Sequence, residues 1–401
     1  MKKGQGKLIF AILVIALVGQ INTIASVMIA DLATAFPTAS PVALQYVMQF
    51  GMIGGFPVSL AMTVLSQKFR KKPMILLGMV LILIGGAVPI FVHSSLVILY
   101  VCAFIVGAGQ GFITPLLGTI ILLNFEGTLK DRILGLNTTF GTGGAALLLM
   151  IAGWVCKTGW VHVYYIYFFV IPVFIVALLC LPMDEVPKAD PSASGPKAAI
   201  PGKGVIQCCL AVLMFIAYAV FPLNLALYVT EYNVGDSAAV GLGMSLVTIV
   251  GALIGLILPQ ITKMFKLYIG TLAAVFGFLA TFCVIIAKNI AMIYVASVLD
   301  GIFFGVMMAG GGYVIGRICR PEQIGPTFSL SMSFVTLGTI FSPIIINFLN
   351  GIWGGAKYGT KGSFITAAAI FVVVIVLQII WGTYLTKTCP PEVAPAAPQE
   401  K

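Results

Sequence analysis

The stretch Leu65-Ser-Gln-Lys-Phe-Arg-Lys-Lys-Pro73 places four cations, Lys68, Arg70, Lys71 and Lys72, between two long apolar runs. Short loops that carry Lys and Arg next to apolar spans stay on the cytoplasmic side, because moving these charges across a bilayer is unfavourable. We therefore expect this loop to be cytoplasmic. It sets the orientation expected for every other segment of the chain.

The composition is typical of a membrane protein. Of the 401 residues, 60% are hydrophobic and 8% are charged, whereas a soluble protein carries about 25% charged residues. The net charge is +10, but the cations separate apolar segments instead of forming one basic patch, so we expect no nucleic-acid partner. The eight cysteines mostly lie in apolar runs without metal-ligand spacing. We therefore expect no disulfide framework, no metal and no other cofactor.

Twelve apolar runs are long enough to cross a bilayer. They lack the alternation of barrel strands, and a backbone in lipid has to satisfy its own hydrogen bonds, so we expect helices. The first run follows three lysines and resembles a signal peptide, but polar residues replace the cleavage site in its second half, so we expect it to be retained. The expected spans are residues 8–30, 43–66, 73–93, 96–124, 133–155, 163–182, 205–229, 239–261, 267–287, 290–318, 326–350 and 363–385.

The distribution of cations supports this topology. With both termini in the cytoplasm, 18 of the 22 Lys and Arg residues fall in cytoplasmic segments. Only Lys157, Lys288, Lys357 and Lys361 fall in outer loops. The sequence therefore predicts a multi-pass protein with both termini cytoplasmic. We expect it in the plasma membrane of a bacterium.

A hydrophilic segment rich in Pro, Gly and Ser divides the spans into six and six. Such a composition favours a flexible tether. We expect an N-terminal six-helix bundle over residues 1–182, a cytoplasmic linker over 183–204, a C-terminal six-helix bundle over 205–385 and a disordered cytoplasmic tail over 386–401.

The two halves are similar to each other at an offset of 194 residues. Glycines repeated at matched positions permit close helix crossings, and a parallel repeat of six helices occurs in one large transporter fold. The first-half residues Tyr100, Gly107, Gly111, Gly118 and Gly144 correspond to Tyr294, Gly301, Gly305, Gly312 and Gly338.

Acidic residues inside the spans are the strongest functional signal. A charge at mid-membrane costs about 2.5–3.5 kcal/mol on insertion scales and normally faces a cavity. Asp300 is the deepest, and we interpret it as a proton acceptor or cation partner; the alternative is a structural acid bonded to a neighbouring helix. Asp31 and Glu231, near the outer ends of their spans, are further proton-coupling candidates or simply reach outer water, and Asp236 is expected in a loop.

Cationic side chains are missing from the middle of the expected spans. No Lys, Arg or His falls there, whereas a transporter for a dianion or a phosphate ester would need a cationic clamp. The sequence therefore favours a neutral or cationic solute, and the many Met and Phe residues suit an amphipathic one.

The chain resembles the major facilitator superfamily across almost its full length. The family's loop signature Gly-x3-Asp-x2-Gly-Arg-Lys corresponds to Ser66-Gln-Lys-Phe-Arg-Lys-Lys, which keeps the basic end but has Gln67 for the acid and Arg70 for the glycine. The run Gly107-Ala-Gly-Gln-Gly111 is similar to the helix-four glycines of the drug/proton antiporter branch, although Ala103 replaces that branch's Arg.

The resemblance implies a gating loop, and among the polar span residues that are candidates for lining a substrate cavity it favours Asn22, Gln110, Asn137 and Asn224. The gating loop would consist of Gln67, Lys68, Arg70, Lys71 and Lys72. For each cavity candidate the alternative is an interhelical hydrogen bond, which contributes about 0.6 kcal/mol on average. The cavity candidates are Asn22, Gln110, Asn137, Tyr218, Asn224 and Tyr228.

Taken together, these features predict an all-α membrane protein of twelve helices in two pseudo-symmetric halves. We expect a monomeric secondary transporter that moves a small neutral, cationic or amphipathic organic solute by alternating access, coupled to protons, with a preference for efflux. The alternative is an uptake permease or facilitator for a neutral nutrient or metabolite, with Asp300 structural. An enzyme is not expected, because no catalytic constellation is present and the two histidines are peripheral. The expected partners are the solute, protons and membrane lipid.

Overall fold

The computed structural model describes residues 5–65, 69–125, 127–182 and 200–388. Within these residues all the regular elements are helices, which confirms the all-α prediction. The first group is α1 (Gln5–Ala16), η1 (Ile21–Ser26), α2 (Ile29–Ala35), α3 (Pro41–Leu65), α4 (Lys71–Phe91), α5 (Leu96–Asn124), α6 (Gly127–Cys156), η2 (Trp160–Phe169) and α7 (Val170–Cys180). The second group is α8 (Gly202–Tyr218), α9 (Val220–Glu231), α10 (Ser237–Phe265), η4 (Lys266–Tyr268), α11 (Ile269–Ile286), α12 (Ile290–Ile318), α13 (Pro321–Trp353), η5 (Gly355–Tyr358) and α14 (Thr360–Thr388).

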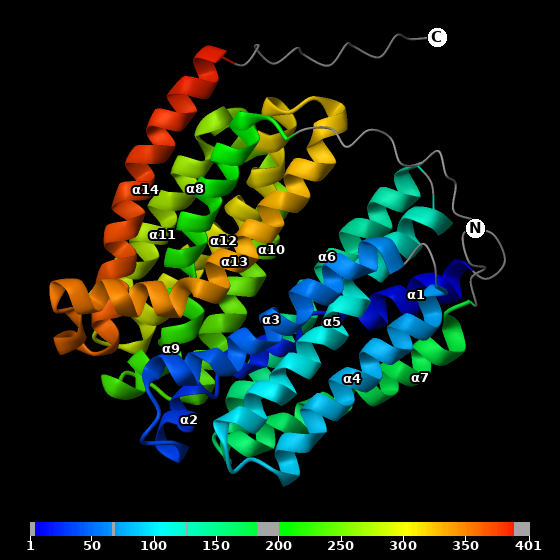
Figure 1. Cartoon of the computed structure of the whole chain (residues 1–401), viewed down its shortest axis with the longest axis horizontal. Helices are drawn as coiled ribbons and strands as arrows, with labels where there is room; N and C mark the ends of the chain where they lie inside the picture. Colours follow the sequence, from blue (N-terminus) through cyan, green and yellow to red (C-terminus); the bar gives the residue numbers. More distant parts are fainter. Residues whose placement is uncertain (1–4, 66–68, 126, 183–199, 389–401) are drawn as a thin grey trace.

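The helices lie in two bundles (Figure 1). Elements α1 to α7 form the N-bundle and α8 to α14 form the C-bundle; the bundles touch mainly where α6 packs on α10, α3 on α13 and α2 on α9. The end of the molecule at which α2 and α9 lie side by side is called the closed end here. Toward the opposite end, the bundles diverge (Figure 1).

Eleven segments of the described chain are long and apolar enough to cross a membrane. Helix α3, with 25 residues, is a further long helix and packs against α5 inside the N-bundle. The multi-span prediction is therefore confirmed, and the count of twelve spans stays a prediction. The eleven segments are Gln5–Ser26, Lys71–Phe91, Leu96–Ile121, Arg132–Cys156, Trp160–Cys180, Gly202–Glu231, Ser237–Leu258, Gln260–Ile286, Ile290–Ile318, Pro326–Trp353 and Thr360–Thr388.

The first span is a broken helix. Helix α1 ends at Ala16, and the chain turns before it continues as η1 at Ile21. Backbone carbonyls freed inside a membrane need another donor. One is supplied by the Gln110 side chain of α5, whose Nε2 donates to the carbonyl oxygen of Gly19 at 3.2 Å. The break is therefore tied to the neighbouring helix.

Several of the repeated glycines lie at close helix crossings. A Cβ atom on Gly107 of α5 would overlap the carbonyl oxygen of Gly51 on α3, and one on Gly301 of α12 would lie 2.8 Å from the carbonyl oxygen of Val247 on α10. Because backbone cannot yield as a side chain can, both crossings require glycine. Each bundle therefore contains the same glycine-dependent contact between equivalent helices.

Gly144 and Gly338 repeat this relation at a second pair of crossings. A Cβ atom on Gly144 of α6 would lie 2.5 Å from the carbonyl oxygen of Leu17 beside α1. One on Gly338 of α13 would lie 2.9 Å from the carbonyl oxygen of Val212 on α8. The internal similarity of the sequence thus corresponds to similar packing in the two bundles.

Candidate functional site

Side chains of α3 join the two bundles. Gln45 Nε2 donates to Oδ1 of Asn224 on α9 at 2.8 Å, and the Tyr46 hydroxyl donates to the carbonyl oxygen of Ile340 on α13 at 3.2 Å. Gln45 and Asn224 are both buried. Hydrogen bonds shielded from water in this way are electrostatically stronger than exposed ones, so these contacts help to hold the bundles together.

A proline in α13 provides another acceptor for α3. Pro343 has no backbone N–H, so the carbonyl group of Thr339, four residues earlier, lacks its helical donor. Gln49 Nε2 donates to this carbonyl oxygen from the other bundle. The interface therefore satisfies a backbone group that the proline leaves free.

Helices α6 and α10 approach each other closely. A Cβ atom on Gly241 of α10 would lie 2.6 Å from the carbonyl oxygen of Leu149 on α6, and Gly153 lies opposite. Near this crossing, Ser245 Oγ donates to the carbonyl oxygen of Ala146 at 2.7 Å. Glycine at the crossing thus lets the two bundles meet backbone to backbone.

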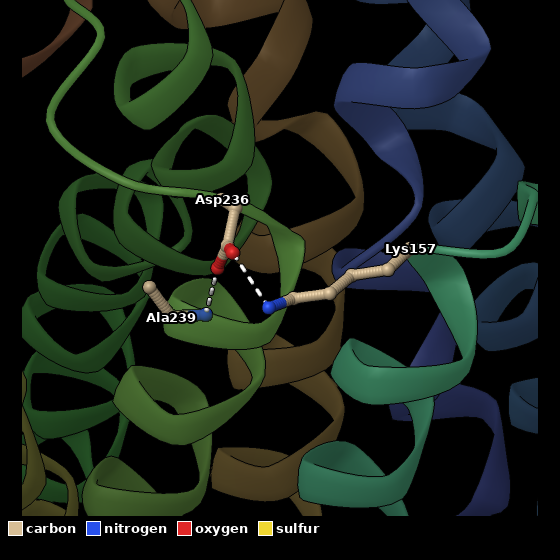
Figure 2. Close-up of polar contacts among 3 residues, drawn as sticks. All are labelled: Lys157, Asp236 and Ala239. Carbon is tan, nitrogen blue, oxygen red and sulfur yellow. Dashed lines mark hydrogen bonds and ion pairs between the residues drawn. The ribbon is translucent and has the colours of Figure 1, made fainter.

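An ion pair connects the same two helices at their ends (Figure 2). Lys157 Nζ, just after α6, lies 2.7 Å from Asp236 Oδ2, just before α10. Asp236 Oδ1 also accepts the backbone N–H of Ala239 at 2.9 Å, as an N-cap of α10. The hydrogen bond from Lys157, followed by that from Ala239, lowers the pKa of the Asp236 carboxyl below its usual value. The residue expected in a loop therefore also bridges the bundles.

A cavity of about 540 Å³ lies between the bundles at the closed end. Its walls come from α2 and α3 of the N-bundle and from α9, α13, η5 and α14 of the C-bundle. No Lys, Arg or His is among the described residues that line it. The lining side chains that carry a charge or an amide group are Gln45, Asn224, Glu231, Asn347 and Asn350.

Glu231 lies at the rim where α9 meets α14. Its Oε2 atom accepts the backbone N–H of Thr360 at 3.0 Å and also the Thr360 hydroxyl. Thr360 is the first residue of α14, so the carboxylate satisfies a free N–H and faces the positive end of the helix dipole. Glu231 is exposed, as the expectation that it reaches outer water requires.

Asp31 is held inside the N-bundle. It lies in the first turn of α2, and its Oδ2 atom accepts the Cys156 thiol of α6 at 2.9 Å. Asp31 is half-buried and is not among the residues that line the closed-end cavity. The contact joins α2 to the end of α6.

Asp300 lies inside α12 and is buried, with an exposed fraction of 2%. Its Oδ2 atom has no hydrogen-bond partner among the described residues. Tyr218, at the end of α8, stacks on Phe303 and Phe304 at centroid distances of 5.3 and 5.6 Å. These two rings follow Asp300 by three and four residues, so they share its helix face. The carboxyl group thus lies in an aromatic region of the C-bundle, apart from the closed-end cavity.

The remaining cavity candidates lie in several places. Asn224 lines the closed-end cavity. Asn22 is buried and its Nδ2 donates to the carbonyl oxygen of Met48 at 3.3 Å. Asn137 on α6 has a buried Oδ1 atom without a hydrogen-bond partner among the described residues. Tyr228 is buried, and its hydroxyl donates to the carbonyl oxygen of Ala287 at 3.4 Å.

The basic loop is only partly described. Gln67 and Lys68 lie outside the described residues; Arg70 is exposed and precedes α4, and Lys71 is buried at the start of that helix. Lys72 Nζ donates to the carbonyl oxygens of Leu178 and Leu181, each at 2.7 Å. A cation at the carboxyl end of α7 complements the helix dipole there.

Several cavity residues were not identified from the sequence. Asn347 and Asn350 lie three residues apart in α13, so they share one face, and both line the cavity with Thr360. Two amides at this spacing inside an apolar span are a usable sequence signal. The pairing of Lys157 with Asp236 gives no such signal, because the two residues belong to different halves of the chain.

The chain matches one protein-family model and several solved structures. The family model described as Major Facilitator Superfamily matches residues 8–286 and 266–401. No curated protein sequence matches the chain. A solved bacterial homolog of the human lysosomal transporter Spinster, inward-facing and unoccupied, has a TM-score of 0.76 at 14% identity over 98% of this chain and 100% of that one.

Two further solved structures are similar in fold. The nucleoside transporter NupG, solved as a point mutant, has a TM-score of 0.73 at 12% identity over 95% of this chain and 99% of that one. A D-xylose-proton symporter has a TM-score of 0.71 at 15% identity over 94% and 97%. At these identities the likeness concerns the fold, while the family match covers nearly the whole sequence. The chain described here belongs to the major facilitator superfamily.

Proposed function

We propose that this protein is a proton-coupled secondary transporter that moves a small neutral, cationic or amphipathic organic solute by alternating access. In this proposal it works as a monomer in a bacterial plasma membrane with both termini cytoplasmic. Its preferred direction is efflux. Family membership and the transporter neighbours support secondary transport, and the residues discussed below support the finer assignment.

The single observation that carries proton coupling is the environment of Asp300. A carboxyl group with an exposed fraction of 2% and an unpartnered Oδ2 atom is costly as a carboxylate in a membrane protein. Protonation removes that charge, so a proton on Asp300 lowers the cost of rearranging the C-bundle around it. Proton coupling follows if the Asp300 carboxyl group contacts water on one side of the membrane in one arrangement of the bundles and on the other side in the second arrangement.

The contacts between the bundles support alternating access. The bundles touch through α3, α6, α10 and α13 near the closed end and diverge toward the other end (Figure 1). Rocking about these contacts would open one end as it closes the other. The cavity between the bundles has a carboxylate, amides and hydroxyls but no described cationic lining residue, which favours neutral or cationic solutes.

A second candidate function is an uptake permease or facilitator for a neutral nutrient or metabolite. It is favoured by one observation: Asp300 is buried and lines none of the described cavities. In that case the carboxyl group has a structural role, and solute movement does not depend on protons.

Transport by reconstituted protein separates these two candidates. The native chain and Asp300→Asn are placed in liposomes with an imposed gradient of one pH unit, and uptake of neutral, cationic and anionic compounds is measured. With one proton per solute, the native protein accumulates its solute up to about tenfold, because one pH unit corresponds to about 1.36 kcal/mol. We expect Asp300→Asn to equilibrate the same solute without accumulation.

Exchange of labelled for unlabelled solute without a pH gradient is the control. Retained exchange in Asp300→Asn demonstrates that the variant is folded and active, so lost accumulation then reports lost coupling. If both proteins merely equilibrate a neutral solute at every pH, the facilitator assignment replaces the coupled one.

A further inference from the structure

The closed-end cavity has one apolar wall. Ala33 and Val42 contribute from the N-bundle, and Leu223, Leu227 and Ile346 contribute from the C-bundle. A volume of about 540 Å³ lies within the 300–1,000 Å³ typical of small-molecule sites. The wall is therefore suited to the hydrocarbon body of a small organic molecule.

The polar part of the cavity lining includes one carboxylate, that of Glu231, which lies one turn beyond Leu227 on α9. Both donors of Thr360 contact the Oε2 atom of Glu231, so the Oε1 atom of the carboxylate keeps acceptor capacity. Gly359, which has a φ of 56° and also lines the cavity, lies beside this Oε1 atom. A Cβ atom at Gly359 would collide with Oε1, so the glycine allows the carboxylate to take this position.

Amide groups extend the polar side. Asn347 and Asn350 also line the cavity, and Asn350 is held by α14: its Nδ2 atom donates to the Ser363 hydroxyl and its Oδ1 atom accepts the Thr366 hydroxyl. Lys357 and Lys361 flank this region in sequence, but neither is among the residues that line the cavity. The described lining therefore combines one carboxylate and several amide groups with apolar side chains.

We propose that this cavity is a binding site for a primary amine with a compact apolar body. The ammonium group has three donors, one of which suits the Oε1 atom of Glu231, and a hydrogen bond between charged groups is about twice as strong as a neutral one. The apolar body lies against the wall formed by Leu223, Leu227 and Ile346. This site rests on the proposed function and narrows its solute to a cationic amine, although binding here does not require proton coupling.

Occupancy has a consequence for the two bundles. Residues of both bundles line the cavity, so a bound amine contacts both at once. A ligand that binds one arrangement better than the other shifts the population toward it. The amine therefore stabilises the arrangement in which this end is closed.

Calorimetric titration of the purified full chain in lipid nanodiscs tests the site. The probes are phenethylamine, 2-phenylethanol and phenylacetate at pH 7, which share a ring and differ in charge. We expect phenethylamine to bind at least about tenfold more tightly than the other two, because a hydrogen bond between charged groups is stronger than a neutral one. Glu231→Gln should raise the Kd of the amine by a similar factor.

Two variants complete the test. Glu231→Asp keeps the charge and should retain part of the affinity, whereas Ala33→Phe fills the cavity without changing its charge and should abolish binding. Thermal unfolding of each variant reports whether it is folded. If Glu231→Gln is not folded, the relative affinities of the three probes and the affinity of Ala33→Phe for the amine test the site. Equal affinity for amine and alcohol, or native affinity in either Glu231→Gln or Ala33→Phe, overturns the proposal. Binding is measured without a pH gradient, so its failure is independent of any failure of coupled transport.

Discussion

The two bundles differ most informatively at one pair of equivalent positions. The offset of 194 residues that aligns Gly107 with Gly301 also aligns Val106 of α5 with Asp300 of α12. Each precedes a crossing glycine, and each has an exposed fraction of 2%. The packing has thus been kept in both bundles, while only the C-bundle carries a carboxyl group in it. The difference indicates that Asp300 is not required to build such a crossing.

The largest effect on stability is expected when each bundle is given the residue that the other bundle has at this position. Val106→Asp places a second carboxyl group in a buried apolar position of the N-bundle and should destabilise the protein by about 2.5–3.5 kcal/mol. Asp300→Val should be at least as stable as the native chain, because it removes a buried carboxyl group with an unpartnered oxygen. Thermal unfolding in detergent measures both. Equal stability of Val106→Asp and native protein would contradict the equivalence of the two positions.

A smaller effect is expected at the glycine crossings. Gly107→Ala should cost about 1–3 kcal/mol, because its Cβ atom would overlap the backbone of Gly51 and the helices would have to separate. Gly118→Ala on the same helix is the matched control, since a Cβ atom there would meet nothing within 4 Å. It should change stability by less than about 0.5 kcal/mol. Denaturant titration measures the free energy of unfolding of both variants. Equal losses of stability would mean that the close approach of α5 to α3 does not cause the cost of Gly107→Ala.

The smallest effect is expected where each bundle supplies one partner of the ion pair. Lys157 and Asp236 are about half exposed, so Lys157→Met should cost no more than about 1 kcal/mol. Because the pKa of Asp236 is lowered in the folded protein, its contribution is present above the unfolded value and is lost as pH falls through the folded value. The stability difference between native protein and Lys157→Met should therefore shrink below about pH 4. A difference that stays constant to about pH 3 would exclude an ionic contribution.

The sequence was sufficient to predict an all-helical protein with many membrane spans, because local patterns decide these features. Long apolar runs require helices in lipid, and repeated glycines such as Gly107 and Gly301 marked crossings that the structure contains. The break after Ala16 was not predicted, because the Gln110 side chain that donates to the carbonyl oxygen of Gly19 is far from it in the sequence.

The candidate site was less accessible to sequence reasoning. Gln45 and Asn224 were both recognisable as polar residues in apolar spans, but nothing local indicated that they contact each other across the bundles. The same holds for Gln49, whose acceptor is free only because Pro343 lies four residues further along α13. Such contacts depend on how two bundles dock, which no short pattern encodes.

The contacts between the bundles also determine which positions of the sequence can change during evolution. Tyr46, Gln49 and Ser245 donate to main-chain carbonyls of Ile340, Thr339 and Ala146. A carbonyl oxygen is present whichever side chain the residue carries, so mutations at these acceptor positions leave the hydrogen bonds possible. At these three acceptor positions the sequence can therefore change extensively, whereas selection should act on the three donors and on Pro343.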